Sequence, residues 1–331
     1  MASQVVDRER LEAAIDVHDV RKSFGRTTAL NGVSFSVPEG SVVGILGPNG
    51  AGKSTLMRVL TTMHRADSGT FKIGGIAGGR PADIRRLIGV LPENAGYPGG
   101  RTGLEYLTYH ARLFGARGGD ARAAAARWLD VVGLGTPATA LIRTYSRGML
   151  QRLGLARALI HSPTVVFLDE PTLGLDPSGR RQILGTIRDI TADSGVTVLL
   201  STHLLDDVEQ FCTRVVVLHR GEVMADGTVA EVSSRFSANR RLHVAVGRQY
   251  LVRALDVLAA LPDVIESGES SDSPGAVIAL LDRSIDPQVA AGRAVGALLD
   301  AGVIPRWYEL EGGRLSEAFF AMTTEPGGGH G

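Results

Sequence analysis

Cysteine is almost missing from this chain of 331 residues, which contains only Cys212. A single cysteine excludes a disulfide framework within the chain, and such sequences are typical of a reducing compartment. Cys212 comes just before the apolar run 215–218. A small core residue is therefore the interpretation we favour, and a reactive thiol is the alternative.

A long hydrophobic segment is missing as well. No apolar run approaches the ~20 residues that a membrane-spanning helix needs. The first ten residues are polar and charged, without the apolar core of a signal peptide. If the protein acts at a membrane, we expect it to do so through a partner.

The chain has no excess of charge of either sign, because 35 Lys and Arg residues balance 35 Asp and Glu residues. This balance argues against a nucleic-acid binder that relies on bulk positive charge, so no nucleic-acid partner is expected. Lysine itself is scarce and occurs only at positions 22, 53 and 72. One of these three lies in the motif described next.

What the sequence does contain is a phosphate-binding loop. Residues 47–55 fit the pattern G-x-x-x-x-G-K-[ST], between an apolar run at 42–46 that predicts a strand and a predicted helix from Leu56. Backbone N–H groups of such a loop hold phosphate oxygens, Lys53 adds a charge, and the Ser54 hydroxyl is placed to bind Mg²⁺. An ordinary glycine-rich turn is the alternative, and the flanking elements argue against it. The nucleotide-binding residues predicted here are Gly47, Pro48, Asn49, Gly50, Ala51, Gly52, Lys53, Ser54 and Thr55.

Two further segments add side chains with chemical function. The apolar run 165–168 ends in Asp169 and Glu170, where Asp169 can hold Mg²⁺ and Glu170 can polarise an attacking water. Two adjacent buried acids are costly unless a cation or substrate lies beside them. His203 follows the apolar strand 196–200 and can contact a terminal phosphate. Taken alone, a histidine there is more often a surface or capping residue.

Strands that alternate with helices predict an α/β fold with a sheet covered on both sides. Residues 15–22 predict an edge strand ahead of it, and 94–145 are richly helical.

After a polar stretch at 233–239, a smaller α+β unit with the order β-α-β-β-α-β is expected. Its predicted strands are 242–246, 264–265, 276–281 and 304–310, and its predicted helices are 250–261, 288–301 and 315–322. The predicted divisions of the chain are a tail 1–14, a nucleotide-binding domain 15–232 with a helical subdomain at about 94–160, an accessory domain 240–324 and a disordered tail 325–331.

Over about residues 15–230 the chain resembles the ATP-binding subunit of an ABC transporter, because several motifs occur in the expected order. Residues 47–55 match Walker A and 165–170 match Walker B. Residues 145–149 lie where the signature motif belongs, and 173–176 match the D-loop. The resemblance implies a P-loop NTPase fold, ATP and Mg²⁺ as ligands, and catalysis by Glu170 with the switch residue His203. It implies further nucleotide contacts from Phe24, Glu93, Ser146, Gly148, Met149 and Asp176, and metal contacts from Ser54, Glu93 and Asp169.

Three positions depart from the common family pattern. Glu93 stands where a glutamine is usual in the Q-loop, and Arg147 and Met149 replace a glycine and the glutamine of the signature. Ser146 and Gly148 remain, so the signature is expected to work. The Tyr-Ser-Arg-Gly-Met form resembles subunits of the ABC-2 class, which includes exporters of drugs, antibiotics and polysaccharides. Residues 313–323 resemble the closing segment of daunorubicin-resistance-type exporters.

The resemblance also implies partners. Two such domains pair head to tail around ATP, so one P-loop and one signature call for a second copy or a paralogue. Residues after Glu93 and the helices of 94–145 would contact a membrane permease, which places the protein on the cytoplasmic face of the membrane. The accessory unit is expected to contact the dimer or another subunit, with regulator binding or simple packing as alternatives. A soluble ABC ATPase acting on ribosomes or DNA, and a non-hydrolytic ATP sensor, are the competing readings.

Overall fold

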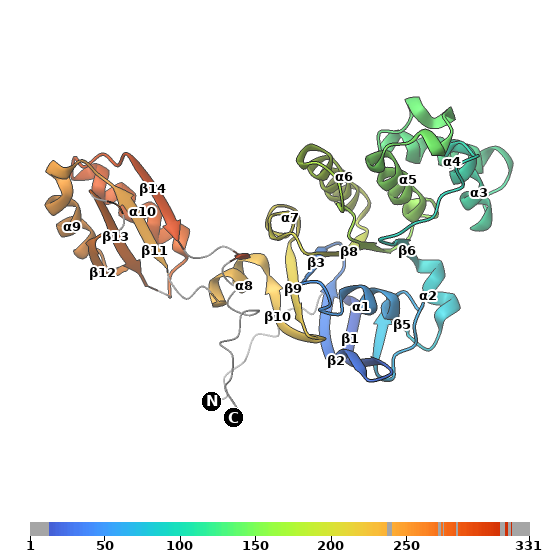
Figure 1. Ribbon diagram of the computed structural model, residues 1–331, viewed down its shortest axis with the longest axis horizontal. Helices are drawn as coiled ribbons and strands as arrows, with labels where there is room; N and C mark the ends of the chain where they lie inside the picture. Colours follow the sequence, from blue (N-terminus) through green and yellow to red (C-terminus); the bar gives the residue numbers. More distant parts are fainter. Residues whose placement is uncertain are drawn as a thin grey trace, which may run out of the picture. The chain divides into compact units, whose positions relative to one another are not determined.

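The structure is a computed structural model that describes residues 13–236, 240–270, 273, 275–282, 284–311, 315, 316 and 319. The chain divides into two compact units, Met1–Thr228 and Val229–Gly331 (Figure 1). None of the helices in these described residues has the length and apolar character needed to cross a membrane.

The first unit opens with a four-stranded antiparallel sheet of order β2-β1-β4-β5. The prediction of an edge strand at 15–22 is wrong, because β1 pairs with β2 on one side and β4 on the other. One face of β1 is buried and the other meets water, and this alternation is the same for an inner and an outer antiparallel strand. The strands are β1 (Ala13–Phe24), β2 (Thr27–Pro38), β4 (Ser68–Ile73) and β5 (Ile76–Ala77).

A six-stranded sheet of order β10-β9-β3-β8-β7-β6 forms the centre of this unit, and only β10 runs antiparallel to its neighbour. Every residue of β3, β7 and β8 is buried, as expected of parallel strands covered on both faces. The predicted α/β class is therefore confirmed. The strands are β3 (Val42–Leu46), β6 (Ile88–Leu91), β7 (Val165–Asp169), β8 (Thr197–Thr202), β9 (Arg214–His219) and β10 (Glu222–Thr228).

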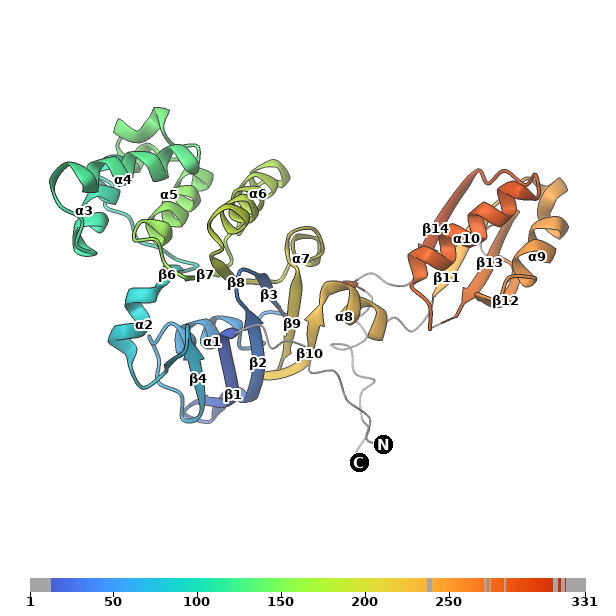
Figure 2. The ribbon, with the colours of Figure 1, turned by 180° about the vertical axis from the view of Figure 1, so that it is seen from behind.

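Helix α1 lies in the hydrophobic core that joins the two sheets. Leu56 and Leu60 of α1 are fully buried and share this core with Val17 of β1 and Phe167 of β7. Helices α3, α4 and α5 gather at one side of the unit, apart from the antiparallel sheet (Figures 1 and 2). The helices are α1 (Lys53–Leu60), α2 (Pro81–Leu87), α3 (Gly103–Leu113), α4 (Gly118–Val131), α5 (Arg147–Leu159), α6 (Pro177–Ser194) and α7 (Leu205–Phe211).

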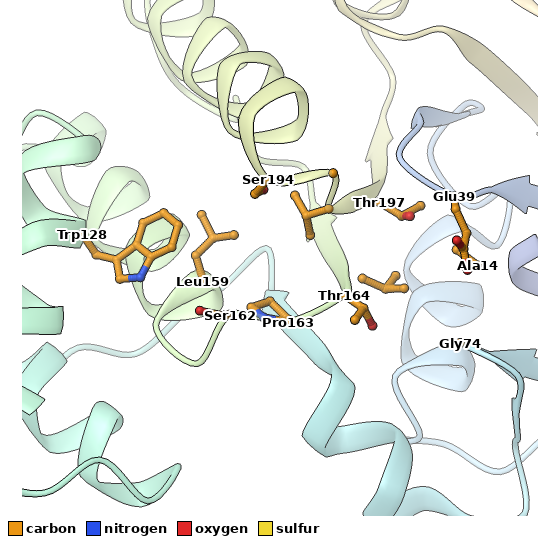
Figure 3. Close-up of a pocket in the computed structure, with 13 residues that line it drawn as sticks. Ala14, Glu39, Gly74, Trp128, Leu159, Ser162, Pro163, Thr164, Ser194 and Thr197 are labelled. Carbon is orange, nitrogen blue, oxygen red and sulfur yellow. The ribbon is translucent and has the colours of Figure 1, made fainter. Parts of the chain in front are cut away.

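A cavity of about 340 Å³ lies at the amino ends of β7 and β8, where Thr164 and Thr197 line it. Figure 3 shows the Trp128 ring on one side of this cavity and Glu39 on the other. The P-loop follows the carboxyl end of the parallel strand β3, so this cavity occupies the opposite edge of the sheet. None of the predicted site residues lines it.

The second unit has the predicted β-α-β-β-α-β order after a first helix, α8 (Val229–Phe236). Its antiparallel sheet has the order β12-β13-β11-β14, and one face packs against α9 and α10 through residues such as Val244, Ala279 and Leu298. The elements are β11 (Arg241–Ala245), α9 (Leu251–Ala259), β12 (Val264–Glu269), β13 (Ala276–Leu281), α10 (Pro287–Asp300) and β14 (Trp307–Glu311). Most of the predicted helix 315–322, the tail 325–331 and nearly all of the tail 1–14 lie outside the described residues.

Candidate nucleotide site

The P-loop connects β3 to α1, and two of its glycines, Gly47 and Gly52, lie where no side chain fits. A Cβ at Gly47 would lie 2.4 Å from the Leu218 carbonyl oxygen, and one at Gly52 would lie 2.5 Å from that of Ala29. Gly52 also precedes α1 with a φ of 105°, a left-handed conformation that glycine adopts without strain. These contacts explain why the turn from strand to helix needs glycine.

Lys53 is buried at the start of α1, and its ammonium folds back over the loop. Its Nζ donates to the carbonyl oxygens of Gly47 at 2.7 Å and Pro48 at 3.2 Å, and lies 3.7 Å from Oε1 of Glu170. Burial lowers the pKa of Lys53, and the nearby carboxylates of Glu170 and Asp169 oppose that shift. The loop carbonyls thus hold the Lys53 ammonium close to the Glu170 carboxylate.

Asp169 ends β7 and receives two hydroxyl hydrogen bonds. Ser54 Oγ donates to its Oδ1 at 3.3 Å, and Ser201 Oγ at the end of β8 donates to the same oxygen. The structure therefore brings Ser54 and Asp169 together, as the sequence predicted. Hydroxyl and carboxylate oxygens are the ligands that Mg²⁺ prefers, so the Ser54 and Asp169 side chains fit such an ion.

Glu170 follows Asp169 in an unusual backbone conformation, with a φ of 49°. Its N–H donates to the Ser201 carbonyl at 3.2 Å and to Ser201 Oγ at 3.1 Å. Its carboxylate lies 3.0 and 3.1 Å from Nδ1 of His203. Because a carboxylate only accepts, Nδ1 carries the hydrogen of this bond. Two neighbouring strand ends therefore fix the Glu170 side chain beside Lys53.

One cavity of about 460 Å³ unites much of the predicted site. It is lined by Asn49–Thr55, Glu93, Glu170 and His203, together with residues that the sequence reasoning missed: Thr27, Thr28, Ala29 and Leu173. The first three form the start of β2, next to the turn after Phe24, so their closeness to the loop follows from the β1–β2 hairpin. Ser201 was missed too, although it closes a buried strand two residues before His203.

The remaining predicted ligands do not line this cavity. The Phe24 ring is 46% exposed and packs edge-to-face on His64 with 5.5 Å between ring centroids. Ser146 caps α5 by accepting from Met149 N, and Asp176 caps α6 by accepting from Gly179 N. Gly148 lies in the first turn of α5, away from the P-loop cavity. A single chain therefore presents only part of the predicted nucleotide contacts.

The sequence matches the family model described as ABC transporter over residues 30–173. The daunorubicin/doxorubicin resistance ATP-binding protein of Streptomyces peucetius is 38% identical, over 95% of this chain and 93% of that relative. This chain belongs to the ABC transporter family. It is an ATP-binding subunit, and the predicted family resemblance is confirmed.

Other ABC relatives agree with this assignment. The linearmycin resistance ATP-binding protein of Bacillus subtilis is 33% identical, over 76% of this chain and 81% of the relative. The Nod factor export ATP-binding protein I of Paraburkholderia xenovorans is 39% identical, over 65% and 71%. A dimeric ATP-binding cassette solved in a post-hydrolysis state with ADP and Pi has a TM-score of 0.60 and 27% identity, over 65% of this chain and 98% of that one.

Proposed function

We propose that this chain hydrolyses ATP to power an ABC exporter, as one of two cassettes bound to a separate membrane permease. The observation that supports this most directly is the placement of Glu170. Its carboxylate is held by His203 and lies 3.7 Å from Lys53 of the P-loop. A fixed carboxylate beside a phosphate-binding loop is what activation of a hydrolytic water requires.

In the proposed reaction, the P-loop amides and Lys53 hold the β- and γ-phosphates. Glu170 orients a water and takes its proton as the water oxygen attacks the γ-phosphorus. The bond between that phosphorus and the bridging oxygen breaks, and ADP and phosphate leave. His203 keeps the carboxylate in place through Nδ1–H, and its second ring nitrogen can reach the γ-phosphate.

Ser54, Asp169 and Glu93 are the residues that would hold Mg²⁺. Ser54 Oγ and Asp169 Oδ1 lie 3.3 Å apart, and Glu93 lines the same cavity. When bound, this ion would neutralise charge on the β- and γ-phosphates. Phe24 extends the site as a stacking surface for adenine, because nearly half of its ring is exposed beside the cavity-lining start of β2.

A second cassette would complete the site. Ser146, Gly148, Met149 and Asp176 lie outside the cavity of their own chain, yet the start of α5 offers free backbone N–H groups. In a head-to-tail pair these groups would reach the nucleotide of the other chain. The similarity to a dimeric cassette supports this arrangement.

The membrane partner is proposed from the similarity to ABC transporter relatives. Residues 94–145 would dock on a cytoplasmic helix of the permease, so the protein would be peripheral at the inner face of the membrane. Relatives named for daunorubicin, doxorubicin and linearmycin resistance and for Nod factor export support a drug, antibiotic, lipid or polysaccharide as cargo. The accessory domain at 240–324 would contact the second cassette or another subunit.

The decisive experiment replaces Glu170 by glutamine. Glu170→Gln keeps the shape and hydrogen bonding of the side chain but removes the base, so ATP turnover should be lost while ATP binding persists and traps the pair. Light scattering with ATP measures the pairing, and phosphate release measures turnover. Glu39→Gln, at the far edge of the sheet, is the matched control. Turnover near the wild-type rate in Glu170→Gln would remove Glu170 from this role.

A further assay separates the proposed function from its competitor. Turnover should rise when the permease is present in vesicles. Stimulation by ribosomes or DNA, and none by the permease, would instead favour a soluble ABC ATPase.

A further inference from the structure

Arg147 occupies an unusual place in the first turn of α5, directly after the N-cap Ser146. The amino end of a helix is its positive pole, so a cation there is locally unfavourable. The first turn of α5 contains no acidic residue to offset it. Within the part of the chain that the structure describes, the exposed Arg147 side chain has no carboxylate partner.

The guanidinium of Arg147 rests on the backbone of Gly174 in the D-loop segment. A Cβ at Gly174 would lie 2.3 Å from Cζ and Nη1 of Arg147 and 2.7 Å from its Nε. Gly174 also has a φ of 72°, where glycine is favoured. The glycine therefore leaves the space that the guanidinium fills, and the two motifs fit each other within one chain.

The P-loop cavity has an excess of negative side chains. Glu93 and Glu170 line it and Asp169 adjoins it, whereas among the described residues Lys53 is the one lysine or arginine in its lining. Lys53 is already engaged by two loop carbonyls. A triphosphate would add further negative charge, and more develops on its terminal phosphoryl group during transfer. Beyond what a bound Mg²⁺ would neutralise, a protein cation beside that group would stabilise this charge further.

We propose that Arg147 supplies this cation to the other chain: in the ATP-bound pair its guanidinium binds the terminal phosphate held by the partner's P-loop, and Gly174 holds it in position. The inference rests on the proposed function, since it needs the head-to-tail pair. A planar guanidinium can bind two phosphate oxygens at once. The unfavourable placement of Arg147 at a positive helix end is relieved when that anion arrives.

The first test measures turnover by single variants. Arg147→Ala should lower the ATP turnover number by at least about 100-fold, since an arginine supplied in trans is typically worth 10³–10⁵ in kcat. Binding of MgADP to the single chain should not change, because Arg147 is absent from the cavity of its own chain. Arg147→Lys should recover only part of the rate, since an ammonium lacks the forked donors. Wild-type turnover by Arg147→Ala would overturn the inference.

A second pair of variants tests the contact between the Arg147 guanidinium and Gly174. Gly174→Ala should displace Arg147 and lower turnover as Arg147→Ala does. Gly75→Ala is the matched control, because Gly75 has a φ of 74° and the space around a Cβ there is open. Equal and wild-type turnover by both glycine variants would remove Gly174 from the proposal.

The third test asks which chain Arg147 serves, with mixed pairs isolated through two different affinity tags before ATP is added. An Arg147→Ala chain paired with a Glu170→Gln chain has one intact site if Arg147 acts across the pair. A wild-type chain paired with the double variant has none. Higher turnover in the first pair supports the proposal, and equal turnover in both, including none, overturns it. If Glu170→Gln alone stays active, the proposed function fails instead.

Discussion

At the scale of a single residue, Ser201 links the Asp169 carboxylate to the backbone of Glu170. Its hydroxyl donates to Asp169 and accepts from the Glu170 N–H. Ser201→Ala should therefore lower ATP turnover by about 10- to 100-fold, the usual effect of removing a group that orients a metal ligand. Steady-state phosphate release over a range of Mg²⁺ concentrations measures this. Ser36→Ala, an exposed position on β2, is the control, and equal rates in the two variants would contradict the expectation.

Asp207 gives a pH dependence at the same scale. It is buried and accepts from Thr172 Oγ1 at 2.9 Å. Burial raises the pKa of Asp207 above the ordinary carboxyl value. The folded state then binds this proton more tightly than the unfolded chain, so stability falls as the pH rises through the shifted pKa.

Asp207→Asn keeps an acceptor for Thr172 but cannot ionise. We expect it to melt at a higher temperature than the wild type above neutral pH, and the difference to vanish below the ordinary carboxyl pKa of about 3.9. Thermal unfolding across a pH series measures this. Asp206→Asn, at an exposed neighbour, should show no such trend. A melting temperature of Asp207→Asn at or below that of the wild type at every pH would rule out the mechanism.

Single residues of the site were predictable where their chemistry is tied to a local pattern. Lys53 and Ser54 follow from the loop motif, and the buried Cys212 follows from its apolar surroundings, with burial raising the pKa of its thiol to about 12. Ser201 was not found, because it reaches Asp169 through the pairing of β8 with β7. Thr27 was not found either, because the approach of the β1–β2 hairpin to the P-loop is a contact between segments distant in the sequence. Long-range register leaves no mark in the sequence around either residue.

At the scale of elements, Tyr97 connects the segment after Glu93 to α5. Its hydroxyl donates to the Leu150 carbonyl at 2.9 Å, and burial raises the pKa of Tyr97 to about 12. Tyr97→Phe would leave that half-buried carbonyl without its donor, so unfolding should become easier by about 1 kcal/mol. Chemical denaturation measures the change. Tyr109→Phe, 59% exposed on α3, is the control, and an equal effect in both variants would show that the hydrogen bond contributes nothing.

Helices and strands with a strong hydrophobic periodicity were predicted to within a few residues. The buried strands β3 and β7 came out as expected. Helix α3 lies within the stretch 94–145 predicted to be richly helical, and Thr102 and Glu105 form a reciprocal capping box at its start. The position of β1 in its sheet was not predictable. An alternating strand records which face is buried, whereas its neighbours depend on pairings made far along the chain.

At the scale of the whole molecule, the proposed pairing has a kinetic consequence. If each site is completed by a second chain, the specific activity should rise with protein concentration and level off once pairs predominate. Phosphate release at saturating ATP over a dilution series measures this. The Glu170→Gln chain at the same concentrations is the baseline. A specific activity that stays constant down to the lowest dilution would mean that one chain suffices.

The family could be predicted at this scale because several motifs occur in a fixed order over residues 15–230. The β-α-β-β-α-β order of the second unit also followed from periodicity. What the second unit contacts could not be derived from its pattern. Its strands alternate toward its own core of Val244, Ala279 and Leu298, and that core accounts for the pattern without any partner.

The left-handed backbone at Glu170 carries a conformational cost that a glycine would avoid. A φ of 49° disfavours every side chain relative to glycine, so a glycine there would relax the main chain and make the fold more resistant to heat than alanine would. Selection for robustness alone would therefore drift toward a smaller residue at this position. The proposed role of Glu170 as the catalytic base gives a chemical reason for the long acidic side chain that stands there instead.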